Sequence, residues 1–253
     1  MMSRIRLLKQ VRQWHRYLGL IVGIQFLFWT LGGFYFSWTN IRQIRSDDIR
    51  NELPVLQMPD SIVPLSEVQL RFAKAYPDAT ISGIQVIQPV TKPACYQIRY
   101  QAQHQEHFAR FLLTNGRALP LLTPQEAEQE ALASIHSGFR ITHTERIDSV
   151  NGHHEYREKP LPAYAVHVSG PNEYVVYVGA ETAQVHAIRN TSWRIFDFLW
   201  MLHVMDYKNR DEINNWVLRI FSLLGLVTLA SGYGLFILTR RRKRSRSVSL
   251  HQE

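Results

Sequence analysis

Cysteine is almost absent from this chain, because only Cys95 among 253 residues carries a thiol. One cysteine excludes an intramolecular disulfide, a zinc site built on several cysteines and a cysteine-ligated iron–sulfur cluster. A single buried thiol is the expected state of Cys95. A phosphate-binding glycine-rich loop, a nucleophile elbow and a dinucleotide-binding fingerprint are missing as well. The sequence therefore lacks the marks of a self-contained soluble-type enzyme and leaves open whether the protein is an enzyme at all.

Charge is missing from two long segments. No charged side chain occurs between Arg16 and Arg42, and none within 220–239. The apolar, aromatic run Tyr17–Trp38 is long enough to cross a hydrocarbon core about 30 Å thick at about 1.5 Å per residue. Because a charge at the bilayer centre costs roughly 2.5–3.5 kcal/mol, two such windows predict two transmembrane helices, over 17–40 and 216–239. A cleavable signal peptide is the alternative for the first run, but the run is too long and no small-x-small site follows it.

The basic residues gather at the two ends of the chain. Segments 1–16 and 240–253 hold 11 of the 29 lysines and arginines, which leaves 18 basic against 20 acidic residues between Tyr17 and Thr239. The net charge of +8 is therefore not a surface patch, and no nucleic-acid partner is expected. Positive flanks stay in the cytoplasm. We expect a protein of the cell's inner (cytoplasmic) membrane, in contact with the lipid bilayer, with both termini as basic cytoplasmic tails and a periplasmic or extracellular central domain.

The central domain reads as two copies of one pattern. A proline-rich linker over 41–64 precedes unit 65–120, which has a helix from Leu65 and strands over 81–88, 96–103 and 108–114. Unit 121–190 repeats the order, with a helix from Thr123-Pro124 and strands over 139–150, 163–168 and 174–178. An amphipathic interfacial segment over 191–215 leads into the second span. The predicted fold class is α+β, with two transmembrane helices flanking an extracytoplasmic pair of helix-on-antiparallel-sheet units.

Several motifs resemble one known family. Trp14-His15-Arg16-Tyr17-Leu18-Gly19-Leu20 looks like the opening of a PepSY-associated transmembrane helix. Leu202-His203, followed by a glycine-containing span that ends in arginines, is similar to the closing segment of such proteins. The element order and the run Tyr177–Val185 resemble the PepSY domain, although Ala183 stands where glycine is usual. The resemblance implies that 65–120 and 121–190 are tandem PepSY-like units.

Two histidines are candidate cofactor ligands, His15 before the first span and His203 before the second. Imidazole is a good axial ligand for haem iron, and the resemblance implies haem b as the cofactor. His203 shares a helical stripe with aromatic residues that would suit a flat ring system: Trp193, Phe196, Trp200 and Tyr207. The alternative is that both histidines belong to aromatic, polar belts at the membrane interfaces.

The length of the chain separates these two histidines. An unbroken helix from His203 to Arg240 would be about 55 Å long, more than one membrane thickness, so we expect a break within 206–215. His15 then belongs to the inner interface and His203 to the outer one, too far apart to ligate one iron within one chain. In a homo-oligomer each histidine would pair with its twin, which gives two bis-histidine haems. The small residues Gly19 and Gly23 are typical of a helix-packing face, whose partner the sequence leaves open.

Two classes of function follow. In the first, suggested by haem-bearing members of the family, the protein is a transmembrane electron-transfer component acting on periplasmic ferric or siderophore-bound iron. Such relatives usually have about four spans, so this chain would need a homo-oligomer or a partner membrane protein. In the second, it is a non-catalytic, membrane-anchored binding, sensor or assembly module, whose sheet edges accept a partner peptide.

Overall fold

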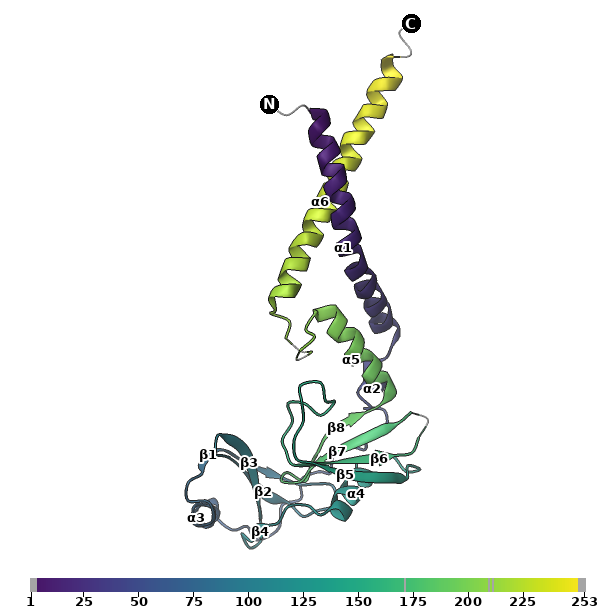
Figure 1. Ribbon diagram of the computed structural model, residues 1–253. Helices are drawn as coiled ribbons and strands as arrows, with labels where there is room; N and C mark the ends of the chain where they lie inside the picture. Colours follow the sequence, from purple (N-terminus) through teal and green to yellow (C-terminus); the bar gives the residue numbers. More distant parts are fainter. Residues whose placement is uncertain (1–3, 171, 209, 211, 250–253) are drawn as a thin grey trace. The chain divides into compact units, whose positions relative to one another are not determined.

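The computed structural model describes residues 4–170, 172–208, 210 and 212–249. The chain divides into two compact units (Figure 1). The helical unit consists of 1–38 and 196–253, and the sheet unit consists of 39–195. The chain combines helices and sheets, and two long apolar helices flank a sheet-rich region. This composition confirms the α+β class.

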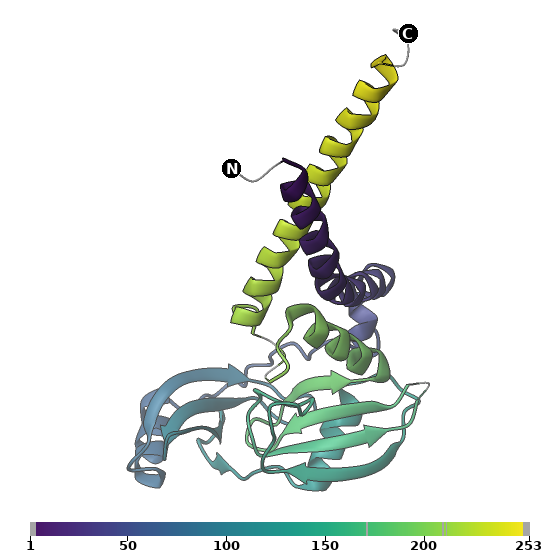
Figure 2. The same ribbon diagram turned by 45° about the horizontal axis from the view of Figure 1, so that its top comes forward.

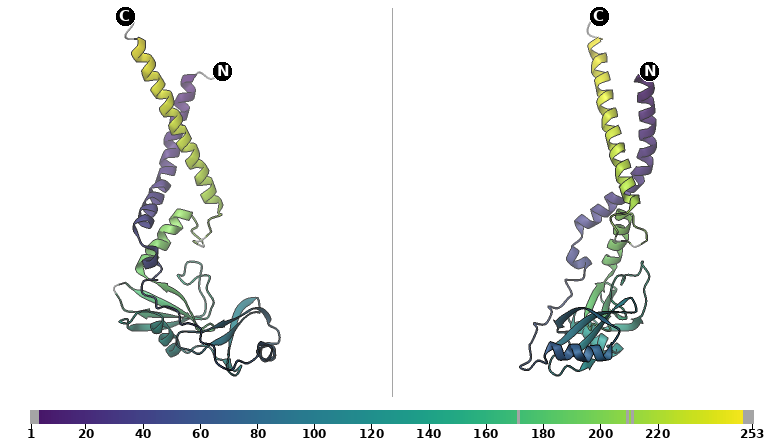
Figure 3. Two further views of the ribbon diagram at one scale, coloured as in Figure 1. Left: turned by 180° about the vertical axis from the view of Figure 1, so that it is seen from behind. Right: turned by 90° about the vertical axis from the view of Figure 1, so that its left-hand side faces the viewer.

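Two helices dominate the helical unit, α1 (Arg4–Trp38) and α6 (Trp216–Ser249). Their segments Leu8–Trp38 and Trp216–Ile237 are long and apolar enough to cross a membrane. The two helices cross each other, and α1 is bent along its length (Figure 3). Large apolar side chains on their outer faces are exposed, as they are on helices that face lipid: Leu20, Ile24, Leu31, Leu223, Leu226 and Phe236.

A third helix, α5 (Thr191–Val204), begins in the sheet unit, and its residues from Phe196 onward belong to the helical unit. Helix α5 ends at Val204 and α6 begins at Trp216, so the two are separate helices, as the length argument predicts. Asp206 organises the turn between them, because its carboxylate accepts the backbone N–H groups of Lys208 (3.1 Å) and Glu212 (3.0 Å). Asp197 is buried and pairs with Arg210 at 2.6 Å, which ties α5 to the turn.

The sheet unit starts with the short helix α2 (Ile41–Ile44), and two halves of similar element order follow. The first half has α3 (Leu65–Ala75), β1 (Thr80–Ile87), β2 (Cys95–Ala102), β3 (Gln105–Leu112) and β4 (Ala118–Leu119). The second has α4 (Pro124–Ala133), β5 (Ile141–Ile147), β6 (Ala163–Val168), β7 (Tyr174–Gly179) and β8 (Val185–Arg189). Each half forms one antiparallel sheet in sequential strand order (Figure 2). The fourth strand of each sheet is absent from the sequence prediction, because strands as short as β4 and β8 do not show a clear alternating pattern.

Each sheet buries one face under its own helix. In the first half, Val68 and Phe72 of α3 pack on Ile98 and Phe111. In the second, residues of α4 and of the sheet share one core: Ala127, Ala131, Tyr164, Val166, Val176 and Ile188. Thr123 caps α4 in a reciprocal capping box with Glu126, and Pro124 occupies the first turn.

The second sheet is buried on its other face too. The loop between β5 and β6 folds over it and places Tyr156, fully buried, against Ala165, Val175 and Tyr177. Every residue of β7 is therefore buried. The sequence of this loop is mainly polar because His153, His154 and Glu155 precede the buried Tyr156.

Polar contacts join the halves, among them one set at Glu130 and another at Glu181. Glu130 of α4, 1% exposed, accepts the N–H groups of Val90 (2.5 Å) and Thr91 (2.9 Å) and the Thr91 hydroxyl (2.6 Å) from the loop after β1. The turn between β7 and β8 docks on β3, where Glu181 accepts the N–H of Phe108 (2.8 Å) and its carbonyl accepts Arg110 Nε (2.7 Å). Because buried polar groups need partners, each contact depends on both halves being folded.

Cys95 is buried and free, as expected. Burial raises the pKa of its thiol to about 11, with Arg110 acting in the opposite direction. The thiol is therefore protonated and unreactive near neutral pH.

Candidate functional site

The two candidate histidines both lie in the helical unit. His15 belongs to α1, and His203 belongs to α5 and contacts α1. Buried residues of the helical unit include Val22 and Gln25 of α1 and Thr228 of α6. Gly225 and Gly232 of α6 give room to large side chains of α1, since a Cβ would stand 3.2 Å from the Phe26 ring and 3.0 Å from His15. Sequence reasoning missed these two glycines as the contact points.

His15 is held in one orientation by α6. Its Nδ1 lies 2.8 Å from Ser231 Oγ, and Ser231 Oγ donates its single proton to the Thr228 carbonyl at 2.8 Å. When the Ser231 hydroxyl donates to the Thr228 carbonyl, its oxygen accepts from His15, which places the imidazole proton on Nδ1 and the lone pair on Nε2. This arrangement, with one ring nitrogen donating to a fixed acceptor and the other unprotonated, is that of a metal-ligating histidine.

His203 sits near the end of α5 inside an aromatic cluster. Its ring is parallel to Trp200 (9°, centroids 6.0 Å apart) and contacts Trp29 and Phe36 of α1, each with a centroid distance of 6.0 Å. Within the described residues, His203 Nδ1 is buried without a hydrogen-bond partner. Such an unpaired buried polar atom is uncommon in folded proteins.

Side chains of α1 donate hydrogen bonds to backbone carbonyls at the end of α5. Gln25 Nε2 donates to the Leu202 carbonyl and Trp29 Nε1 to the His203 carbonyl, both at 2.8 Å. Carbonyls at a helix end have no intrahelical partner, so these bonds explain why polar groups interrupt an otherwise apolar span. The signal in the sequence was Gln25 itself, the one amide side chain within Tyr17–Trp38.

The structure does not bring His15 and His203 together. His203 meets α1 at Trp29, which lies 14 residues beyond His15, or about 21 Å along the helix. Two axial ligands of one iron must lie on opposite sides of the same atom, so one chain cannot supply both. Gly19 and Gly23 face open space, since a Cβ at either would meet no atom within 4 Å.

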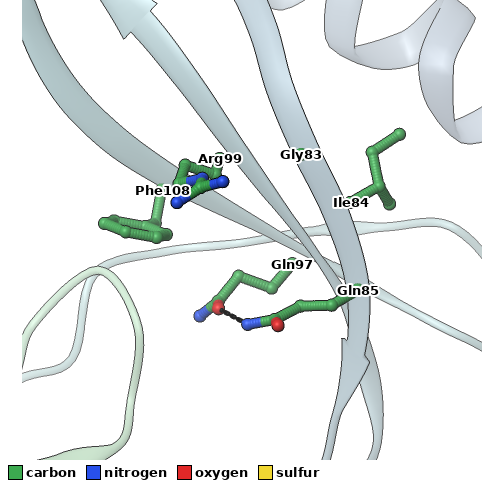
Figure 4. A pocket seen from close by; sticks show the side chains of 6 residues that line it. All are labelled: Gly83, Ile84, Gln85, Gln97, Arg99 and Phe108. Atoms are coloured by element: carbon green, nitrogen blue, oxygen red, sulfur yellow. Dashed lines mark hydrogen bonds between the residues drawn. The ribbon is translucent and has the colours of Figure 1, made fainter.

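The sheet unit contributes a groove of about 240 Å³ on the first sheet (Figure 4). The side-chain amides of Gln85 and Gln97 bond each other at 2.6 Å, and the Arg99 guanidinium lies beside the Phe108 ring. Gly83 leaves the space open, since its Cβ would stand 3.4 Å from Arg99. A cation, two amides and a ring face can receive a flat polar ligand. No group of three or more histidine, cysteine or acidic side chains in the described residues is arranged to hold a metal ion.

Fold and site together define a membrane-anchored α+β protein whose apolar helices are joined by polar side-chain contacts. A family model described as the PepSY-associated TM region matches residues 12–252. The chain belongs to this family, which confirms the resemblance of its N-terminal and C-terminal segments, and it is a PepSY-domain membrane protein. No curated protein and no solved structure matches the chain.

Proposed function

We propose that this protein is a transmembrane electron-transfer component that holds haem b through His15 and His203 and serves the reduction of periplasmic ferric iron, free or siderophore-bound. The observation that carries the proposal is the bond from Nδ1 to Ser231, which orients the His15 ring and leaves Nε2 without a hydrogen-bond partner among the described residues. Haem iron held by two imidazoles supplies reversible one-electron transfer. Ser231 would orient the first ligand, and the rings of Trp29, Phe36 and Trp200 would bound the second site.

The proposal requires more than one copy of the chain. Because His15 and His203 lie about 21 Å apart along α1, each would pair with its twin in a homodimer. The open face at Gly19 and Gly23 supports a close contact between two copies of α1. We also infer that the protein resides in the inner membrane, that both basic ends are cytoplasmic, and that the sheet unit is two tandem PepSY-like units on the periplasmic side.

Absorption spectra of the detergent-purified protein, oxidised and then reduced, test the proposal. We expect b-type Soret and alpha bands at about one haem per chain. His15→Ala and His203→Ala should each lower the haem content by about half, whereas His104→Ala, in an exposed turn, should leave it unchanged. A colourless protein, or full haem content in both variants, would refute the proposal.

The second candidate is a binding or sensor module without a cofactor. It is favoured by the groove of Figure 4, whose polar lining needs no haem to receive a ligand. A stable, colourless protein that co-purifies with a specific partner, and loses it on Arg99→Ala, would support this function.

A further inference from the structure

A second cavity, of about 200 Å³, lies in the sheet unit where four segments meet. Its walls come from the linker after α2, the loop after β1, one side of α4 and the start of β8. Pockets for drug-sized ligands hold roughly 300–1,000 Å³, so this cavity suits a small group or one end of a longer molecule.

The linker wall is rigidly attached to the end of α4. Asn51 Nδ2 donates to the carbonyls of Ala133 (2.9 Å) and Ile135 (2.8 Å), and the Asn51 N–H donates to the Ser134 carbonyl (2.9 Å). Arg50, the preceding residue, forms an isolated β-bridge with Ile135. The backbone that carries Arg50 is therefore fixed before any ligand arrives, which lowers the entropic cost of binding.

Arg50 is a cation without an ion-pair partner in the part of the chain that the structure describes. It lines the cavity, its Nε is buried without a hydrogen-bond partner, and it forms no ion pair within the described residues. A guanidinium presents its N–H groups as a planar fork that matches a carboxylate. Leaving one of these donors buried and unpaired is costly, so the site gains from an anionic oxygen.

The acidic residue in the wall is already satisfied. Glu130 directs both carboxylate oxygens to Val90 and Thr91, through the three hydrogen bonds that join the two halves. Burial lowers the pKa of Arg110, and Glu130 is among the groups that oppose this shift. The charge of Glu130 therefore acts on Arg110. Glu130 is therefore engaged away from Arg50 and does not replace a ligand.

The remaining polar groups of the wall are neutral. His186 bonds the Tyr156 hydroxyl through Nδ1 and the Thr182 hydroxyl through Nε2, each at 2.8 Å. Burial lowers the pKa of His186 to about 4, so its ring is uncharged near neutral pH. The Gln88 oxygen is taken by the Gln57 N–H at 2.7 Å, so its amide group offers donors, and the Gln184 amide stands beside it in the lining. One cation surrounded by neutral donors selects a single negative charge.

We propose that this cavity binds a carboxylate, with the Arg50 guanidinium as its counter-ion and the side-chain amides of Gln88 and Gln184 as further donors. The carboxylate can belong to a small organic acid or to the C-terminus of a peptide, since both present the same group. The proposal is independent of haem, because all of these residues belong to the sheet unit.

Isothermal titration of the full-length, detergent-purified protein tests the site. Propionate is titrated against the uncharged isostere propionamide, and tetra-alanine with a free C-terminus against its amidated form. We expect binding only of the charged member of at least one pair, and the pair that binds identifies the source of the carboxylate. Equal heats for both members of each pair, or no binding by any probe at millimolar concentration, would overturn the proposal.

Variants locate the binding. Arg50→Gln should weaken the affinity at least about tenfold, whereas Arg45→Gln removes the same charge from an exposed position five residues earlier and should not change it. If Arg50→Gln does not fold, Arg50→Lys retains the charge but loses the fork and should weaken binding severalfold. Wild-type affinity in a folded Arg50 variant would show that the charged probe binds elsewhere, and would also overturn the proposal.

Discussion

Replacing Glu130 with glutamine should destabilise the sheet unit far more than its size suggests. The oxygen of the introduced amide would retain the two donors of Thr91, but the new NH₂ group would face the N–H of Val90, donor against donor. An unsatisfied buried N–H costs about 1–3 kcal/mol, and two bonds lose their charge assistance at about 1 kcal/mol each. The expected loss is therefore about 3–5 kcal/mol.

The assay is thermal unfolding of the purified full-length protein, followed by the far-UV circular dichroism of its β-sheets. For a unit of this size, about 2–4 °C corresponds to 1 kcal/mol, so the melting temperature should fall by roughly 10 °C. Glu128→Gln on the same helix is the control, because Glu128 accepts one bond, from the Thr144 hydroxyl, and a glutamine can still accept it. A melting temperature for Glu130→Gln within about 3 °C of the Glu128→Gln value would refute the reasoning.

Three further predictions concern single side chains. The pKa of His186 is about 4 in the folded protein against 6.5 unfolded, so the unfolded chain binds a proton first as the pH falls. Stability should decrease by about 3 kcal/mol between about pH 6.5 and pH 4, and a pH–melting curve that is unchanged in His186→Asn would contradict this. Gln25→Leu removes the donor to the Leu202 carbonyl and should lower the stability of the helical unit by about 1–2 kcal/mol, measured as a lower melting temperature. The control Thr30→Val loses only a bond within α1 and should leave the melting temperature unchanged. Ser231→Ala removes the hydrogen-bond partner of His15 Nδ1, and it should reduce haem content in titrations of the purified protein. An occupancy equal to the wild type would speak against the ligand role of His15.

Local patterns in the sequence were sufficient to predict most elements of the fold. Absence of charge placed the two apolar helices, because the energetic cost of a charge in lipid acts residue by residue. Thr123-Pro124 predicted the start of α4, because the preference for proline at the first helical position depends only on the local backbone. The order of helices and strands followed from their periodicities in the same way.

The contacts that build the sites were not predictable in this way. His15 and Ser231 are 216 residues apart, Gln25 and Leu202 are 177 apart, and Glu130 and Val90 are 40 apart. Each pair depends on how separate elements pack, and no local pattern specifies a partner at such distances. Arg50 looked like an ordinary linker residue, since only the folded arrangement shows that its Nε is buried and unpaired among the described residues.

The docking of the β7–β8 turn on β3 has a consequence for synthesis of the chain. Phe108 leaves the ribosome 73 residues before Glu181, the side chain that its N–H will bond. At roughly 5–20 residues per second this interval lasts about 4–15 s. For most of that time the first sheet, which ends at Leu119, is complete in sequence but lacks the turn that docks on β3. The nascent protein therefore passes through a stage in which an unpaired strand surface is open to chaperones or to a neighbouring chain, and this stage ends only when the second half has emerged.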